Sequence, residues 1–566
     1  MRAVQKWWTQ PEFAQVIYLL IGGLLLRGTV AIWLPPGFDE AYYYLYTPNL
    51  NWSYFDHPLM VALTTGFGPW LTGEVSQFTI RLAALLLYTG ALAFLYLTSA
   101  RLFSTRAAVL TLAIASIVPI FQFGFGILTL PDSPLMFFWS AALYVAAEEF
   151  FPASEEYHPS DRLALIGLLV GLACLSKYHG LALGFGLVGF CLTSPRHRVA
   201  LLSPWMLAAG ALFLLAIAPI VIWNAQHGWI SFYYQSGRAI PDRGYSLIAL
   251  LETFLLGVVY LFPTFGFPLW WVSVRAVAGQ MGRGRGGEGE VKEDAETRRH
   301  GDAENVQSAI CNLQSAISTS NLKIRFIVWL SLPLMLGFTL MGGYRPILPT
   351  WPMPGFWGAV LLLGDRAAHW PTCWVRRWLW GSGLAIATLL LIALLHLTLG
   401  TLQKSSRYAW FGGVLPASAD ASVQLVDIQQ IRRGFAASPV LTFALQQTDF
   451  VFTSEIFLAG YVDMAIAPFN PPPMTSFSDD LRGLAFWSTA DQWVGKDGLY
   501  ITSSRLPNAD PYKPYFQQIQ KIGEFSLQRG ETIVETIQVY QCQTLLKPYP
   551  RPYGNGTQQW NRSDHF

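Results

Sequence analysis

The sequence contains few charged residues. Asp, Glu, Lys and Arg make up 13% of its 566 residues, whereas they make up roughly 25% of a soluble protein. Hydrophobic residues account for 52% and the mean hydropathy is +0.35, which favours a membrane protein over a soluble one. The net charge of +2 gives no support to a nucleic-acid-binding protein.

Cysteine is also scarce, and the common nucleotide-binding motifs are lacking. No two of the five cysteines have metal-ligand spacing, and only Cys542 lies outside the apolar region and its connectors. A disulfide framework is therefore not expected. The region after residue 400 contains neither a phosphate-binding loop nor a dinucleotide fingerprint.

Long apolar runs are abundant. A membrane-spanning helix needs about 20 apolar residues, and the first run is too long for a cleaved signal peptide. About eleven candidate spans lie near residues 13–34, 79–100, 107–127, 131–149, 163–176, 178–193, 200–223, 247–274, 324–342, 352–364 and 379–400. The pair 163–176 and 178–193 alternatively forms one long helix that is broken near Lys177.

The distribution of basic residues predicts on which side of the membrane each loop lies. If the N-terminus is cytoplasmic, then Arg101, Arg106, the stretch 194–198 and Arg377 fall in cytoplasmic loops, as the positive-inside rule expects. The acidic loops and the C-terminal region then lie on the other side. We therefore expect a multi-pass protein of the cell (inner) membrane with an extracytoplasmic C-terminal domain.

Two segments differ from the apolar runs. Residues 276–323 are rich in Gly and charge and are predicted to be a disordered cytoplasmic insertion within a transmembrane domain of residues 1–400, either a linker or a docking segment. Residues 401–566 alternate turns with short apolar runs, which is typical of a soluble α/β domain. Its expected elements are a strand at 449–453, a helix at 454–461 and strands near 497–503 and 533–541.

The loop after the first apolar run carries the strongest chemical signal. In GFDEAYYYLYTPNLNWSYFDHPLM, residues 37–60, the pairs Asp39-Glu40 and Asp56-His57 enclose a run of aromatic residues. The aromatics alone fit an interfacial belt. A carboxylate among residues that exclude water can have a raised pKa and act as a general base. Two adjacent acids, with others brought in by folding, can also hold a divalent cation.

Three further polar residues fall at the same depth in the predicted topology. They are Asp132, Lys177 and Arg345. The alternatives are a helix N-cap for Asp132, snorkelling for Lys177 and a plain flanking charge for Arg345. A lysine at such depth costs roughly 2.5–3.5 kcal/mol on insertion scales, which argues for a function. Cations here suit a phosphate, and an apolar groove between spans suits a lipid tail.

Several of these motifs resemble a known family. The segments DEAYYYLYTPNLNWSYFDHPLMVAL, LPDSPLMFFWSAALY, GLLVGLACLSKYHG and RPILPTWPMPGF are similar to the bacterial branch of glycosyltransferase family 39. This dolichyl-phosphate-mannose-protein mannosyltransferase-like group includes the lipid A aminoarabinose transferases. The resemblance covers roughly residues 10–400. It implies a GT-C fold and inverting transfer of a sugar from a polyprenyl-phosphate carrier to an acceptor hydroxyl at an extracytoplasmic site.

The resemblance also suggests roles for single residues. Asp39 would be the base or a metal-linked acid. The run Phe55-Asp56-His57-Pro58 is similar to an F-E-K-P motif, with His57 in place of lysine. The predicted site comprises Asp39 and Glu40 as catalytic residues, Lys177, Arg345, Arg81 and His57 as donor phosphate ligands, and Asp56 and Asp132 as supporting or metal-linked acids.

Two other functions compete with a transferase. A lipid-linked sugar transporter or flippase should show repeated halves and charges deep in several spans, and the sequence shows no such repeat. A non-catalytic membrane assembly subunit should tolerate loss of the loop acids. The sequence leaves open the sugar, hexose or pentose, the acceptor, which could be a lipid, a protein or a glycan, and any need for a divalent metal ion.

Overall fold

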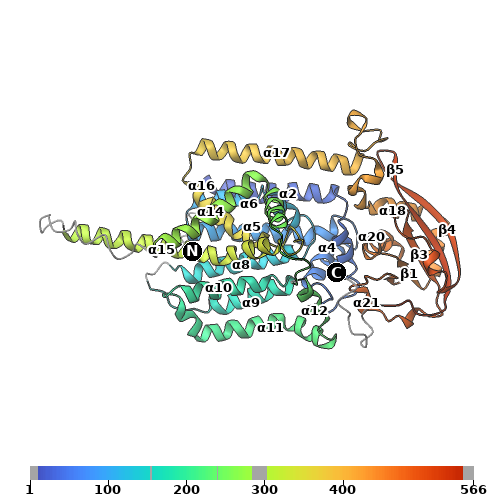
Figure 1. The fold of residues 1–566 in the computed structure, drawn as a ribbon, viewed down its shortest axis with the longest axis horizontal. Coiled ribbons are helices and arrows are strands. Elements are labelled where there is room, and N and C mark those ends of the chain that lie inside the picture. Colours follow the sequence, from blue (N-terminus) through green and yellow to red (C-terminus); the bar gives the residue numbers. More distant parts are fainter. Residues whose placement is uncertain (1–10, 153–155, 239, 284–302, 552–566) are drawn as a thin grey trace.

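The protein consists of a bundle of long helices with a β-sheet domain across one end (Figure 1). The computed structural model describes residues 11–152, 156–238, 240–283 and 303–551. The predicted fold class, a multi-spanning helical membrane protein with a C-terminal α/β domain, is confirmed. The two parts meet where the loop after the first helix packs against the sheet domain.

All eleven predicted apolar runs fall on helices, although the run 107–127 is divided between α6 (Thr105–Ala115) and α7 (Pro119–Gly124). The bundle and its connections contain α2 (Pro11–Trp33), α3 (Phe38–Tyr44), α4 (Met60–Thr72), α5 (Leu82–Leu102), α6 (Thr105–Ala115), α7 (Pro119–Gly124), α8 (Asp132–Phe150), α9 (Arg162–Ser176), α10 (Gly180–Thr193), α11 (Pro204–Gln226), α12 (Ile230–Gly237), α13 (Leu247–Tyr260), α14 (Pro263–Arg283), α15 (Ala303–Met341), α16 (Met353–Ala368) and α17 (Thr372–Leu399). In the described part of the chain, five helices are long and apolar enough to cross a membrane, or six with one bent pair. The count of eleven spans therefore stays a prediction.

The structure decides one open alternative of the predicted topology and changes other details. α9 and α10 are separate helices, in agreement with the two predicted runs, so residues 163–193 do not form one continuous helix. The predicted span 247–274 is two helices, α13 and α14, bent by 116°. The flanks of the predicted disordered insertion are helical, because α14 extends to Arg283 and α15 begins at Ala303. The intervening residues 284–302 lie outside the described part.

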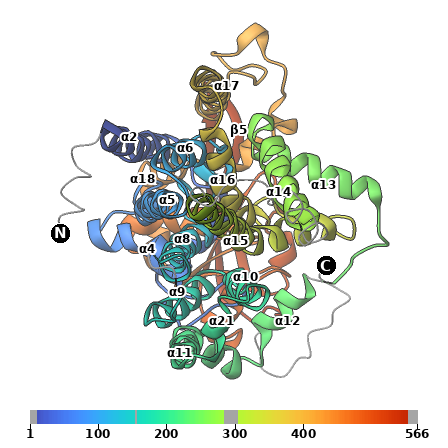
Figure 2. The same cartoon turned by 90° about the vertical axis from the view of Figure 1, so that its left-hand side faces the viewer.

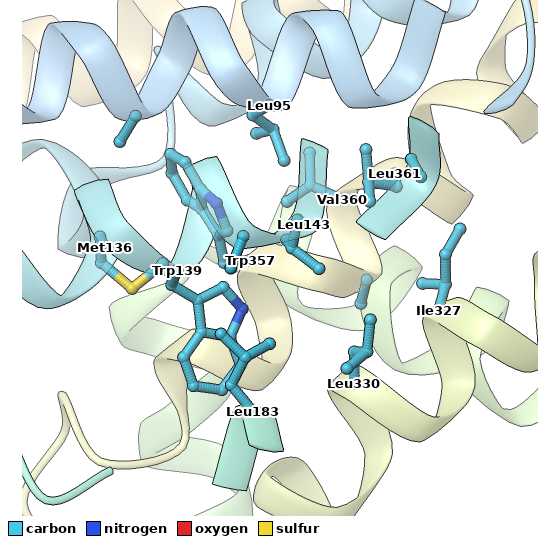
Figure 3. Packing of buried hydrophobic residues seen from close by; sticks show 14 of the residues in the cluster. Leu95, Met136, Trp139, Leu143, Leu183, Ile327, Leu330, Trp357, Val360 and Leu361 are labelled. Atoms are coloured by element: carbon cyan, nitrogen blue, oxygen red, sulfur yellow. The ribbon is translucent and has the colours of Figure 1, made fainter. Parts of the chain in front are cut away.

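Apolar side chains pack the middle of the bundle. Figure 2 shows α8, α15 and α16 near its centre, with α2, α11 and α17 at the rim. Trp139 and Trp357 lie in the central cluster among leucine, isoleucine and valine side chains (Figure 3). The Trp357 indole N–H donates a hydrogen bond to Ser140 Oγ at 2.9 Å. The rim helices leave large apolar side chains exposed, including Leu207 and Leu384, as a lipid-facing surface requires.

The C-terminal domain contains a mixed sheet. Within the described residues its order is β2-β1-β3-β5-β4, with parallel β2–β1 and β1–β3 pairs and antiparallel β3–β5 and β5–β4 pairs. The elements are α18 (Ile428–Ala436), α19 (Pro439–Gln447), β1 (Phe450–Thr453), α20 (Ile456–Ile466), β2 (Met474–Ser476), α21 (Leu484–Trp487), β3 (Gly498–Ser503), β4 (Phe516–Arg529) and β5 (Thr532–Leu545). The predicted strands match β1, β3 and β5, and the predicted helix matches the start of α20, whereas β2 and β4 were not predicted.

A close contact between α20 and α3 joins the domain to the bundle. A Cβ atom on Gly460 of α20 would lie 2.1 Å from the carbonyl oxygen of Ala41 in α3. Only glycine permits this approach. The Tyr461 hydroxyl adds a hydrogen bond of 3.0 Å to the Pro36 carbonyl. The domain is therefore docked directly beside Asp39.

Candidate active site

A cavity of about 400 Å³ lies between the end of the helical bundle and the C-terminal domain. Its walls come from α3 and the loop that follows, the start of α8, the α9–α10 connection, α12, the segment before α16, and the C-terminal domain. The polar and aromatic lining residues include Asp39, Tyr43, Asp56, His57, Asp132, Lys177, Tyr178, His179, Tyr234, Gln235, Arg238, Trp351, Phe457 and Arg482. Five of the eight predicted site residues therefore share one cavity.

Asp39 is the second residue of the short helix α3 and faces the cavity. Burial raises the pKa of its carboxyl to about 6, while the charge of Arg482 opposes the rise and the charge of Asp56 adds to it. A carboxyl with this pKa is ionised at neutral pH, yet it is more basic than an exposed aspartate. It meets the requirement for a general base.

Glu40 points away from the cavity and forms a buried ion pair with Arg81. Its carboxylate accepts from Arg81 Nε at 2.8 Å and from Arg81 Nη2 at 2.5 Å. The backbone N–H groups of Gly37 and Thr129 donate to the same carboxylate at 2.8 and 2.9 Å. Neither Glu40 nor Arg81 lines the cavity, so the structure does not bring these two predicted site residues to the other five.

Asp132 and Lys177 form a second ion pair, which lines the cavity. Asp132 is the first residue of α8, and Lys177 directly follows α9. The ammonium lies 2.8 Å from both carboxylate oxygens, and both side chains are nearly buried. Lys177 therefore does not snorkel to the membrane surface. The pair fixes the Lys177 ammonium in the wall of the cavity, beside its counter-ion Asp132.

The Asp56-His57 pair is held by tyrosines and carries less positive charge than the resemblance implies. The hydroxyls of Tyr46 and Tyr42 donate to Asp56 Oδ1, the latter at 3.3 Å. Burial, followed by the charges of Lys177 and two arginines, lowers the pKa of His57 well below its usual value. His57 is therefore neutral, and its Nδ1 lacks a hydrogen-bond partner among the described residues.

Arg345 lies outside the cavity wall and binds a loop. Its Nη1 donates to the carbonyls of Gly237 and Ile240 at 3.1 and 3.0 Å, and its Nε lies 3.6 Å from Asp242. The cavity instead contains two arginines that the sequence analysis did not identify. Arg238 follows α12, with its guanidinium 4.9 Å from the centre of the Trp351 ring. The other, Arg482, belongs to the C-terminal domain.

Comparisons with known proteins agree with this architecture. Residues 56–223 match the family model described as dolichyl-phosphate-mannose-protein mannosyltransferase. Lipid A galacturonosyltransferase RgtD of Rhizobium johnstonii is 25% identical over 342 residues, which cover 59% of this chain and 61% of RgtD. The chain thus spans about three fifths of that relative.

Two crystal structures of ArnT from Cupriavidus metallidurans share the fold. The apo structure gives a TM-score of 0.54 at 15% identity, and the structure bound to undecaprenyl phosphate gives 0.55 at 14%. Each comparison covers 92% of this chain and 97% of ArnT. The chain therefore has the GT-C fold of ArnT, and its residues 56–223 are similar to the mannosyltransferase family.

The family match includes only part of this GT-C site. The matched segment contains Asp56, His57, Asp132 and Lys177. Asp39 precedes that segment, and the two unforeseen arginines, Arg238 and Arg482, follow it. The signals in the sequence were weak, since Arg238 ends an aromatic segment and Arg482 sits in DDLRGLAFW, far along the chain.

The site of this GT-C protein does not fit the predicted metal arrangement. The adjacent acids Asp39 and Glu40 do not face one cation together, because the Glu40 oxygens accept hydrogen bonds from Arg81 and two backbone N–H groups. Asp132 is likewise paired with Lys177. Across the described ranges, no group of three or more His, Cys, Asp or Glu side chains is placed to hold a metal ion. We therefore assign no step to a metal.

Proposed function

We propose that this GT-C protein is a membrane glycosyltransferase that moves a sugar from a polyprenyl-phosphate carrier to an acceptor hydroxyl, with inversion at the anomeric carbon. One observation carries the proposal: the cavity brings Asp39 together with Lys177 and Arg238 at one end of an apolar bundle. A base and fixed cations are what transfer from a phosphate leaving group needs.

Each polar group has a role in the proposed reaction. Arg238 and Lys177 bind the carrier phosphate, and the Asp132 carboxylate orients the Lys177 ammonium. The acceptor oxygen bonds to the anomeric carbon while the bond from that carbon to the phosphate oxygen breaks. The hydroxyl proton passes to Asp39, and the electron pair leaves with the carrier phosphate. Cations already in place stabilise the charge that develops on it.

Two relatives suggest which carrier and which sugar to test first. ArnT has been crystallised with undecaprenyl phosphate, which supports a polyprenyl-phosphate carrier here. An apolar groove of about 400 Å³ between α9, α10 and α11 offers room for part of an isoprenyl tail. RgtD is a galacturonosyltransferase, so an undecaprenyl-phosphate-linked uronic acid is the first donor to test, with a pentose donor as the comparison. Lipid, protein and glycan acceptors are tested separately.

The proposed orientation places the cavity on the extracytoplasmic side. Asp39, Lys177 and Arg482 share one cavity, so the loop acids, the α9–α10 connection and residues 401–566 face the same side. Arg101, Arg106 and the stretch 194–198 lie at the ends of α5, α6 and α10 that are remote from this cavity (Figure 1). The positive-inside rule puts that end, and the N-terminus, in the cytoplasm.

Transfer by the purified protein in liposomes tests the proposal. The assay supplies the candidate donors with a lipid A-type acceptor and follows both glycosylated product and released carrier phosphate. Asp39→Asn should lower the rate at least about 100-fold, which is the usual contribution of a general base. Asp161→Asn is the matched control, because Asp161 is an exposed residue at the opposite end of α9.

The alternatives predict different results. Donor movement across the bilayer without release of carrier phosphate would favour a transporter. Full transfer by Asp39→Asn would remove Asp39 from the proposed role. Tolerance of simultaneous loss of Asp39 and Asp56 would favour an assembly subunit.

A further inference from the structure

A short segment of the C-terminal domain closes the cavity. Trp487 of α21 lies edge-on to Tyr46 with ring centres 5.4 Å apart, and Phe486 stacks on Phe55 at 5.8 Å. The backbone N–H of Gly483 donates to the Tyr42 hydroxyl at 3.1 Å. These contacts all involve α3 or the loop that follows it. The wall of the candidate active site is therefore incomplete without the C-terminal domain.

Arg482 is the charged residue that this segment contributes to the cavity. Its Nη1 lies 3.9 Å from Asp56 Oδ2, and its Nε lies 3.2 Å from Asp480 Oδ2. The guanidinium also lies over the Tyr42 ring at 5.6 Å. Its backbone φ is +40°, a conformation that residues other than glycine rarely adopt. Strain of this kind concentrates at functional sites and persists where the surroundings impose it.

Asp39 is surrounded by charged groups from several elements. Asp56 and Arg482 are joined as a pair, Asp132 is paired with Lys177, and Arg238 extends from the end of α12. The imidazoles of His57 and His179 also line the cavity. Among these groups the guanidinium of Arg482 favours the ionised form of Asp39 most, and Asp56 disfavours it most.

We propose that Arg482 is a positioning residue through which the C-terminal domain completes the cavity and keeps Asp39 as a carboxylate that can accept the acceptor's proton. The inference rests on the proposed function. The guanidinium offsets the negative charge of Asp56 and adds positive charge near Asp39. A bound carrier phosphate brings further negative charge, so this contribution matters most when the donor is present.

The pH dependence of transfer tests this role. In the wild type the rate rises with pH as Asp39 loses its proton, with a midpoint set by its pKa of about 6. Arg482→Gln removes the positive charge that favours ionised Asp39 and leaves the negative charge of Asp56 without compensation. The midpoint should therefore rise by about one pH unit. Transfer should then be about fivefold lower than wild type at pH 6 and close to wild type at pH 8.5.

Three variants separate charge from structure. Arg482→Lys keeps the charge and should keep the wild-type midpoint. Asp56→Asn with Arg482→Gln removes both charges and should return the midpoint toward the wild-type value. Arg505→Gln, at an exposed residue of the same domain, should change neither midpoint nor rate. Thermal unfolding of each variant reports whether the C-terminal domain remains folded.

The results distinguish this inference from the proposed function. If Arg482→Gln and Arg482→Lys lower transfer equally at every pH while the midpoint stays fixed, Arg482 does not act through Asp39 and the inference is overturned. A midpoint that stays shifted in the double variant also contradicts it. If the wild type transfers no sugar from any donor, the proposed function itself fails and this inference fails with it.

Discussion

Substitutions of the adjacent residues Asp39 and Glu40 should have different effects. A change at Asp39 should impair transfer, and a change at Glu40 should lower the stability of the fold. Glu40 is a buried partner of Arg81, with side-chain exposures of 1% and 0%, respectively. Glu40→Ala leaves the buried guanidinium of Arg81 without its counter-ion. Removing one member of a buried pair typically costs about 3–5 kcal/mol, a large part of the stability of a folded domain.

The magnitude follows from the contacts of the carboxylate. Glu40 accepts two hydrogen bonds from Arg81 and one each from the backbone N–H groups of Gly37 and Thr129. Glu40→Gln keeps the shape but loses the charge, so it should fall between Glu40→Ala and wild type. Asp39→Asn should leave the unfolding temperature near that of wild type and lower the transfer rate at least about 100-fold.

Thermal unfolding in detergent and transfer per folded molecule are the two assays. Glu74→Ala serves as the control, because Glu74 is an exposed acid near the same end of the bundle. The expected pattern is a lower unfolding temperature with near-normal transfer at low temperature for Glu40→Gln. An unchanged unfolding temperature with no transfer in Glu40→Ala would refute the structural role and support the sequence-based prediction that Glu40 is catalytic.

Three further predictions concern the cavity. Lys177→Met and Asp132→Asn should both lower the unfolding temperature, because each leaves a buried charge without its partner. Lys177→Met should in addition raise the KM for the donor at least about tenfold, since it removes a charge-assisted phosphate contact. Arg345→Ala should leave the donor KM unchanged. It should increase proteolysis near residues 240–242, because Arg345 binds the Ile240 carbonyl and the Asp242 carboxylate. Wild-type transfer should fall as pH drops below about 6, because Asp39 then takes up a proton and cannot act as a base; a flat profile between pH 5 and 7 would contradict the raised pKa.

The helical part of the fold was predictable from composition. Apolar runs of this length have few stable alternatives in a bilayer, because backbone groups must be satisfied within a helix. Hydropathy alone did not reveal the bend between α13 and α14, since Leu261 and Phe262 are as apolar as their neighbours, but Pro263 directly after them marks a helix boundary. Strand β4 was missed because most of its side chains are polar, although only Gly530 and Glu531 separate it from its hairpin partner β5.

The sequence predicted which site residues lie at the same end of the helical bundle, but not which side chains face the cavity. Counting spans brings Asp39, Asp56, Asp132 and Lys177 to one end, and the structure places them in one cavity. Span counting cannot separate Asp39 from Glu40. Adjacent residues in a helix point in directions about 100° apart, so one side chain reaches the cavity and the other turns to Arg81. Only the packing of α3 determines which residue does which.

The replacement of a family lysine by His57 has a consequence for the whole cavity. The resemblance predicts a cation at this position, but His57 is neutral in its buried setting. Positive charge enters instead from α12, through Arg238, and from the C-terminal domain, through Arg482. A charge that the resemblance places in the first external loop is thus supplied by segments that must dock onto that loop. Docking of the C-terminal domain through Gly460 and the Tyr461 hydroxyl is therefore a condition for the electrostatics at Asp39, and loosening this contact should impair transfer even though neither residue reaches the substrate.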